Sequence, residues 1–195
     1  MRVFVVYCHP SESSFTHKVY EQFLKGLAAA GHEAVVSDLY KMNFKTDLSE
    51  EEYLRETYYR ADMPLPEDVV AEQEKIQSSD AIVFIYPVFW TEAPAKLVGW
   101  FDRVWTTGFA YSPDPQIKTL DKALVIACAG KSIASLTEVG EKQAMETVML
   151  GDRIRERAKQ KEMVILDGIT NWNEDVKMRL MPEHLEKAYQ LGLNF

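Results

Sequence analysis

The stretch Val3-Phe4-Val5-Val6-Tyr7-Cys8-His9-Pro10-Ser11-Glu12-Ser13-Ser14-Phe15-Thr16 decides the fold of this chain. Its first half is a short, valine-rich apolar run, which is typical of a β-strand and too brief for a helix. Its second half is a serine-rich loop that leads into an amphipathic helix. Apolar residues recur every four positions along that helix, at Phe15, Val19, Phe23 and Leu27. Gly31 is expected to follow the end of the helix in the left-handed conformation.

The serine-rich loop has the chemistry of a phosphate site. A strand that leads through a loop into a helix places free backbone N–H groups and the positive end of the helix dipole at one point. Ser11, Ser13, Ser14 and Thr16 add hydroxyl donors. Each hydrogen bond to a charged acceptor contributes about 1.5–3 kcal/mol. The alternative is that Ser13 or Ser14 serves only as the N-cap of the helix.

The composition is that of an ordinary globular protein, and it argues against several classes of partner. The 195 residues, 47% of them apolar and 27% charged, suit a single domain over 1–195. The net charge of −8 argues against nucleic acid and anionic membranes as partners. No apolar run approaches the roughly 20 residues of a membrane span. Because the chain starts with a strand and not with a signal-type segment, we expect a cytoplasmic protein without direct membrane insertion.

The two cysteines are expected to be free thiols. Cys8 and Cys128 both lie near the ends of predicted strands, with another strand between them. Two strand spacings amount to about 9.5 Å, which exceeds the limit of roughly 7 Å between the Cα atoms of a disulfide. The Cys and His spacings do not resemble a zinc site, so no metal is expected.

Strands and helices alternate along the rest of the chain. After the first strand we expect four more, at 33–39, 81–86, 123–129 and 163–168. Helices are expected at 67–78, 95–105, 137–161 with a break near Gly151, and 182–191. The poorly periodic segment 40–63 is expected to contain a helical turn near 48–59. This alternation predicts an α/β protein with a doubly wound, five-stranded parallel sheet and helices on both faces.

Three loops are expected to meet at the carboxyl edge of this sheet. Ligands of such sheets bind at the carboxyl ends of the strands, where the winding reverses. The loop 9–16 suits a phosphate, the aromatic loop 87–94 suits a flat ring, and the loop 130–132 is small and flexible enough for its backbone to approach a ligand. A phosphate together with a planar ring points to flavin mononucleotide or to the flavin end of FAD.

The chain also resembles a known family, the flavodoxin-like NAD(P)H:quinone oxidoreductases. The resemblance covers Val3 to about Gly130, in the order found in the family, and fades beyond Lys131. The matching segments are His9-Pro10 with Ser14-Phe15, the run Ser37-Asp38-Leu39-Tyr40-Lys41-Met42-Asn43-Phe44, Asp68-Val69-Val70-Ala71-Glu72-Gln73, Tyr86-Pro87-Val88-Phe89-Trp90, Pro94, Lys96-Leu97-Val98-Gly99-Trp100-Phe101-Asp102-Arg103-Val104 and Gly108-Phe109-Ala110-Tyr111.

This resemblance implies a flavodoxin-like fold with strand order 2-1-3-4-5, a non-covalent flavin and a homodimer with two sites at its interface. The mechanism of the family passes a hydride from NAD(P)H to the flavin, and a quinone or similar small acceptor then takes two electrons. The residues implied to bind the cofactor fall into three groups: His9, Ser13, Ser14, Phe15 and Thr16 at the phosphate; Pro87, Val88, Phe89, Trp90 and Thr91 along the ring; and Cys128, Ala129 and Gly130, preceded by Ala127, on the other side.

The sequence departs from the family pattern in two places, and the residue roles tied to those places are not assigned to this chain. Larger relatives have a Gly-Gly turn after the fourth strand and then a Tyr and a His that assist hydride transfer. Here the turn reads Cys128-Ala129-Gly130-Lys131, and no Tyr or His occurs between Lys131 and Lys161, so no side chain is assigned a catalytic role. The chain also lacks the long C-terminal extension of the larger FAD enzymes, which favours FMN, with FAD as the alternative.

Several residues allow a second interpretation. His9 either binds the cofactor or is a self-contained loop histidine, and Trp90 either packs on the flavin or caps the core. Trp100, Phe101 and Trp105 have the spacing of core residues on a helix. The run Arg153, Arg155, Arg157, Lys159, Lys161 is interpreted as a solvated helix face, with the phosphate of a nicotinamide dinucleotide as the alternative.

Two other functions also remain open. Some relatives are ancillary subunits of membrane potassium-efflux systems, in which a flavodoxin-like dimer regulates the membrane partner. A flavodoxin-type electron carrier is the other alternative. Its phosphate loop follows a Thr/Ser-x-Thr-Gly-x-Thr pattern, from which the loop 9–16 departs.

Overall fold

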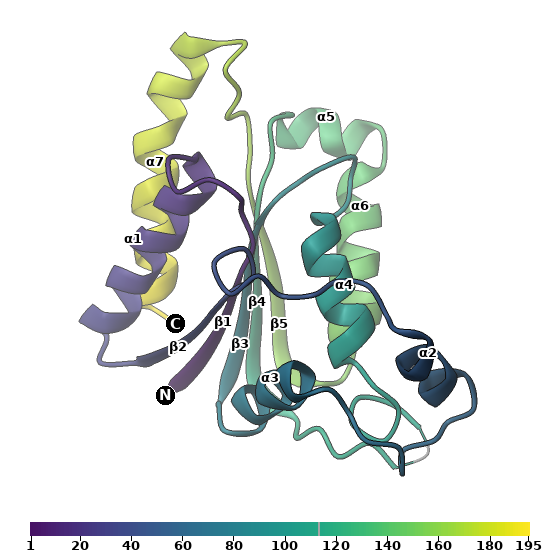
Figure 1. Ribbon diagram of the computed structural model, residues 1–195. Helices are drawn as coiled ribbons and strands as arrows, with labels where there is room; N and C mark the ends of the chain where they lie inside the picture. The colour runs from purple at the N-terminus through teal and green to yellow at the C-terminus, as the bar shows by residue number, and fades with distance from the viewer. Residues whose placement is uncertain (113) are drawn as a thin grey trace.

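The computed structural model describes residues 1–112 and 114–195. Five parallel strands form one sheet in the order β2-β1-β3-β4-β5 (Figure 1). The strands are β1 (Arg2–Tyr7), β2 (Glu33–Asp38), β3 (Ala81–Pro87), β4 (Leu120–Cys128) and β5 (Ala158–Leu166). The predicted order and the parallel direction of the sheet are confirmed.

Helices cover both faces of the sheet, as predicted. On one face lie α1 (Phe15–Ala29) and α7 (Glu174–Leu193), side by side in Figure 1. On the other side lie α2 (Glu50–Thr57), α3 (Glu67–Gln77), α4 (Ala95–Val104), α5 (Ile133–Glu138), α6 (Glu141–Glu146) and the π-helical segment η1 (Thr147–Ile154). Gly31 follows α1 at φ +75°, in the left-handed region, as expected.

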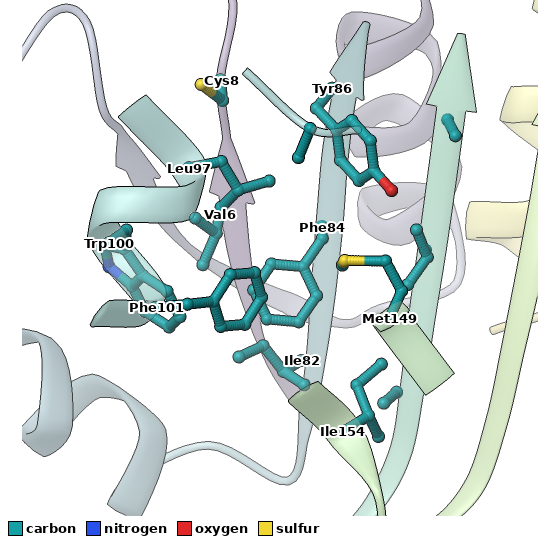
Figure 2. Close-up of a cluster of buried hydrophobic side chains, with 14 of the residues drawn as sticks. Val6, Cys8, Ile82, Phe84, Tyr86, Leu97, Trp100, Phe101, Met149 and Ile154 are labelled. Atoms are coloured by element: carbon teal, nitrogen blue, oxygen red, sulfur yellow. The ribbon is translucent and has the colours of Figure 1, made fainter. Parts of the chain in front are cut away.

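The central strands are apolar throughout because each of their faces packs on a layer of helices. In β3, Ile82, Phe84 and Tyr86 belong to the core beneath α3, α4 and η1, whereas Val83 and Ile85 belong to the core beneath α1 and α7. Figure 2 shows the first of these cores, in which the Phe84 ring lies 5.0 Å from that of Phe101 and 5.7 Å from that of Trp100. Trp100 and Phe101 are therefore core residues, as their spacing predicted.

The segment before β5 corrects one prediction. A helix was expected over 137–161 with a break near Gly151, but the helical structure is divided at Gly140, continues through Gly151 and ends at Ile154. β5 already begins at Ala158. The reason is that β4 starts earlier than expected, at Leu120, and Leu120 pairs with Ala158. The basic run from Arg153 to Lys161 therefore does not form one helix face, because it is divided among η1, a turn and an edge strand.

The C-terminal helix also begins earlier than predicted, at Glu174 and not at 182. Asn173 caps it, since its side-chain oxygen accepts a hydrogen bond from the Val176 amide at 3.1 Å. Pro182 lies inside the helix. A proline after a polar segment resembles a helix start in the sequence, which is why the first two turns were missed.

An ion-pair network holds the long excursion 40–63 against α3 and α4. The Arg103 guanidinium on α4 donates to the Glu52 carboxylate at 2.7 Å and to the Asp68 carboxylate at 2.5 and 3.0 Å. Glu52 also completes a capping box with Ser49 at the start of α2. The bonds to Arg103 hold the pKa of the Asp68 carboxyl below its usual value. The expected helical turn near 48–59 is confirmed as α2.

The two cysteines are free and buried, as predicted. Cys8 faces the core beneath α4 and Cys128 faces the core beneath α1 and α7. The sheet itself therefore separates the two sulfur atoms. In the part of the chain that the structure describes, no helix combines the length and apolar character needed to cross a membrane.

Helices α1 and α7 touch through their backbones at Gly26 and Gly192. A Cβ added at Gly26 would overlap the carbonyl oxygen of Tyr189, and one added at Gly192 would overlap that of Phe23. Both glycines lie near the carboxyl ends of their helices, so the helices run in the same direction and their amino ends lie at the same edge of the sheet.

We expect Gly26→Ala to lower the free energy of unfolding by about 1–3 kcal/mol, because the new methyl group forces the two helix backbones apart. Chemical denaturation followed by circular dichroism measures the change. Gly151→Ala is the matched control, since the nearest atom to its Cβ, Thr147 Cγ2, is 4.0 Å away. Equal unfolding midpoints for Gly26→Ala and the wild type would contradict the close packing.

Candidate functional site

A cavity of about 570 Å³ lies at the carboxyl edge of the sheet. Its volume falls within the range of about 300–1,000 Å³ that is typical of ligand sites. It is enclosed by the loops after β1, β3, β4 and β5 and by the first turns of α7. Its lining residues are His9, Ser13, Ser14, Phe15, Thr16, Lys18, Pro87, Val88, Phe89, Cys128, Ala129, Gly130, Ile169, Thr170, Asn171, Lys177 and Met181.

The loop between β1 and α1 forms one end of this cavity. The Ser14 hydroxyl accepts a hydrogen bond from the His17 amide at 3.0 Å, so Ser14 is the N-cap of α1 and also lines the cavity. The hydroxyls of Ser11 and Ser13 lie 2.9 Å apart. The predicted N-cap is thus confirmed at Ser14. The phosphate site stays a prediction, which is favoured by the first amides of α1 at the same end, because such amides lack acceptors within the helix.

His9 is held by its own loop. Its Nδ1 accepts a hydrogen bond from the Ser11 amide at 2.9 Å. Burial lowers the pKa of the imidazole, with the nearby Ser11 carbonyl acting in the opposite direction. A neutral imidazole that accepts through Nδ1 carries its proton on Nε2. The Nε2–H group of His9 is therefore a donor that the loop hydrogen bond to Nδ1 leaves free.

The loops after β3 and β4 form the other end. The Val88 amide donates to the Cys128 carbonyl at 2.8 Å, and the Ala129 amide donates to the Leu166 carbonyl at 2.9 Å. These bonds continue the ladder of the sheet beyond the strands. The two loops therefore leave the sheet from fixed positions, with small or apolar residues facing the space between them.

The aromatic loop turns sharply after Phe89. Phe89 and Glu92 exchange two backbone hydrogen bonds of 2.9 Å each, and between them Trp90 and Thr91 adopt φ values of +51° and +66°. The Trp90 side chain is fully exposed, so it does not cap the core. The Glu92 carboxylate, at 3.0 Å from Arg153 on η1, helps to fix the turn.

Four of the residues predicted for the site do not line the first cavity: Ser11, Trp90, Thr91 and Ala127, of which Ala127 is buried in the core. Trp90 and Thr91 line a neighbouring cavity of about 490 Å³, together with Leu136, Lys131 and Glu141. The two cavities share Val88, Ala129, Gly130 and Thr170. The other predicted residues, from His9 to Gly130, are brought together around the first cavity.

The C-terminal segment contributes residues to the site that were not predicted from the sequence. Thr170, Asn171 and Lys177 line the first cavity, and Lys177 donates to the Asn171 side chain at 3.0 Å. Lys18, one helical turn into α1, is a second cation there. In a parallel sheet, the segment after the fifth strand also leaves from this edge, which is the signal that could have placed it here. The predicted start of the last helix at 182, eight residues after its true start at Glu174, hid this contribution.

The comparisons with known proteins agree with this arrangement. A family model described as having a flavodoxin-like fold matches residues 1–153. The chain belongs to this flavodoxin-like family. The structure of the NAD(P)H:quinone oxidoreductase from Methanothermobacter marburgensis is similar over the whole chain and 95% of its own, with 44% identity and a TM-score of 0.93.

More distant relatives match less of the chain. NAD(P)H dehydrogenase [quinone] 1 of Rattus norvegicus is 34% identical over 124 residues, which are 57% of this chain and 45% of its own. The chain thus spans about half the length of the curated relatives it matches. An FMN-dependent NADH-azoreductase from Bacillus anthracis, solved in complex with FMN, has 19% identity and a TM-score of 0.65 over 98% of this chain and all of its own, a likeness of fold.

Burial raises the pKa of the Cys8 and Cys128 thiols to about 12. At pH 8 a thiol with that pKa is a thiolate in a fraction on the order of 10⁻⁴. We expect both cysteines to react very slowly with a chromogenic disulfide reagent in the native protein at pH 8. The reaction should accelerate as the pH rises toward 12, because only the thiolate attacks.

The control is the same protein unfolded in guanidinium chloride, in which both thiols should react at the rate of an exposed cysteine. Rapid modification of the folded protein at pH 8 would contradict the burial of the two sulfur atoms.

Proposed function

We propose that this protein is a flavin-dependent NAD(P)H oxidoreductase that reduces quinones or similar small acceptors. The observation that carries the proposal is the first cavity. Anion-binding donors at the start of α1 lie at one end of it, and small or apolar residues with accessible backbone lie at the other. The full-length likeness to an NAD(P)H:quinone oxidoreductase supports the same activity.

The residues at the α1 end suit a phosphate. The first amides of α1, the hydroxyls of Ser13, Ser14 and Thr16, and the ammonium groups of Lys18 and Lys177 are all donors. Among the described residues that line this cavity, none carries a carboxylate. An anion would thus meet hydrogen-bond donors and no lining carboxylate, although Glu174, 3.3 Å from the Lys177 ammonium group, offsets part of the positive charge there.

The residues at the other end suit a flat ring. Val88 and Phe89 offer apolar surface on one side, and Ala129 and Gly130 are small enough for their backbone to come close on the other. When bound, a flavin would supply the chemistry, taking two electrons from NAD(P)H and giving them to the acceptor. The chain would hold the ring, orient it toward the second cavity and keep water from the enclosed side. We propose FMN, with FAD as the alternative.

We propose a homodimer as the assembled form. Tyr53, Tyr58 and Tyr59, on and just after α2, are each more than half exposed, and Met42 and Leu48 are exposed in the same excursion. Clusters of exposed aromatic and apolar side chains are enriched in interfaces between proteins. A second copy of the chain would cover them.

We expect the purified protein to be yellow, with absorbance bands near those of free flavin, and to oxidise NADH or NADPH in the presence of 1,4-benzoquinone. Mass analysis of the heat-released cofactor separates FMN from FAD. If flavin-loaded protein oxidises neither donor, the proposed function is wrong.

We expect Ser14→Glu to lose the cofactor, because a carboxylate would then face the phosphate at the start of α1. Absorbance at the flavin bands relative to protein measures retention. Ser14→Ala is the control: it removes the N-cap, at a cost of about 0.5–2 kcal/mol, but adds no charge and should keep most of the flavin. Full flavin occupancy in Ser14→Glu would show that the phosphate site lies elsewhere.

A further inference from the structure

The second cavity opens beside the space that the proposed function gives to the flavin ring. It shares Val88, Ala129, Gly130 and Thr170 with the first cavity, and its volume is about 490 Å³. Its other walls are Trp90, Thr91 and Leu136, with Lys131 and Glu141. A small molecule in this cavity would lie against the same backbone that borders the ring.

Two ionisable side chains occur among the described residues that line this cavity, and they form a pair. The Lys131 ammonium lies 2.6 and 2.8 Å from the two carboxylate oxygens of Glu141. Lys131 directly follows Gly130, and Glu141 is the first residue of α6. The Lys131 side chain is 58% exposed and that of Glu141 25% exposed. An ammonium group has three N–H donors, so the pair leaves Lys131 a donor for a further acceptor.

Reduction of a quinone to a hydroquinone needs a hydride and a separate proton. The hydride forms one new bond to the quinone, and the oxygen that then carries the negative charge must receive a proton. The remaining side-chain donors that line the cavity, among the described residues, are the hydroxyls of Thr91 and Thr170 and the indole of Trp90, which are far weaker acids than an ammonium group. A positioned acid of this kind contributes a rate factor of about 10²–10⁴.

We propose that Lys131 is the proton donor to the acceptor and that Glu141 positions its ammonium group. In this step, which rests on the proposed function, an N–H bond of Lys131 breaks and an O–H bond forms on the reduced quinone. Lys131 is left as a neutral amine and takes a proton back from water at its exposed side. The electrons come from NAD(P)H through the bound flavin.

The test is the oxidative half-reaction in a stopped-flow spectrometer, with flavin-loaded protein reduced by NADH or NADPH and then mixed with an acceptor. Lys131→Met should slow reoxidation by 1,4-benzoquinone by about 10²-fold. Reoxidation by ferricyanide should be unchanged, because ferricyanide takes electrons without a proton. The dissociation constant of FMN, measured by fluorescence quenching, and the rate of reduction by NAD(P)H should also match those of the wild type.

Two further variants sharpen the test. Lys142→Met removes a lysine of α6 that pairs with Glu146 and does not line the cavity. It should leave the rates of reoxidation by both acceptors unchanged. Lys131→Arg keeps the positive charge and the hydrogen bond but does not give up a proton, so it should remain slow with benzoquinone.

Three outcomes would overturn the proposal: an unchanged benzoquinone rate in Lys131→Met, an equal loss with ferricyanide, or full recovery in Lys131→Arg. If the wild-type protein binds no flavin or does not reduce benzoquinone, it is the proposed function that fails. The two failures are thus distinguishable.

Discussion

The parallel pairing of β1, β3 and β4 is the constraint on which the rest of this structure depends. Because all three strands run in the same direction, their carboxyl ends lie at one edge, and the hydrogen-bond ladder continues past them into the loops. The Cys8 amide donates to the Ile85 carbonyl at 3.0 Å, and the Val88 amide donates to the Cys128 carbonyl at 2.8 Å. The loops that border the cavity therefore start from rigid positions, as a binding site on a scaffold of this kind requires.

The close contact of α1 with α7 completes the cavity. Since Gly26 and Gly192 let the two backbones touch near their carboxyl ends, the amino ends of both helices remain close together at the loop edge. That proximity brings Lys177 to the same cavity as Ser14. The contact between Gly26 and Gly192, although distant from the cavity, therefore helps to place the Lys177 ammonium group beside it.

Much of this arrangement is predictable from the sequence, because it depends on patterns among residues that are close together in the chain. Apolar continuity predicts β3, and the Ser14 region predicts the helix start that lines the cavity. What escapes prediction depends on pairing between distant segments. The strand Ala158–Leu166 is predicted only from Met163 onward, because residues 159–162 are polar and exposed and form a strand only through their pairing with β4. Similarly, Pro182 hides the true start of α7, and with it the approach of Lys177.

The turn at Trp90 and Thr91 gives the two ends of the site different tolerances for sequence change. Both residues hold backbone conformations that L-amino acids with side chains adopt at a cost of about 1–2 kcal/mol each, and Trp90 is wholly exposed. Replacement by glycine would relieve that cost without disturbing a core contact. Ser14 has no such freedom, because its hydroxyl accepts the capping hydrogen bond from the His17 amide at the start of α1. Sequence change is therefore least costly at this turn, which borders the second cavity, and more costly at Ser14.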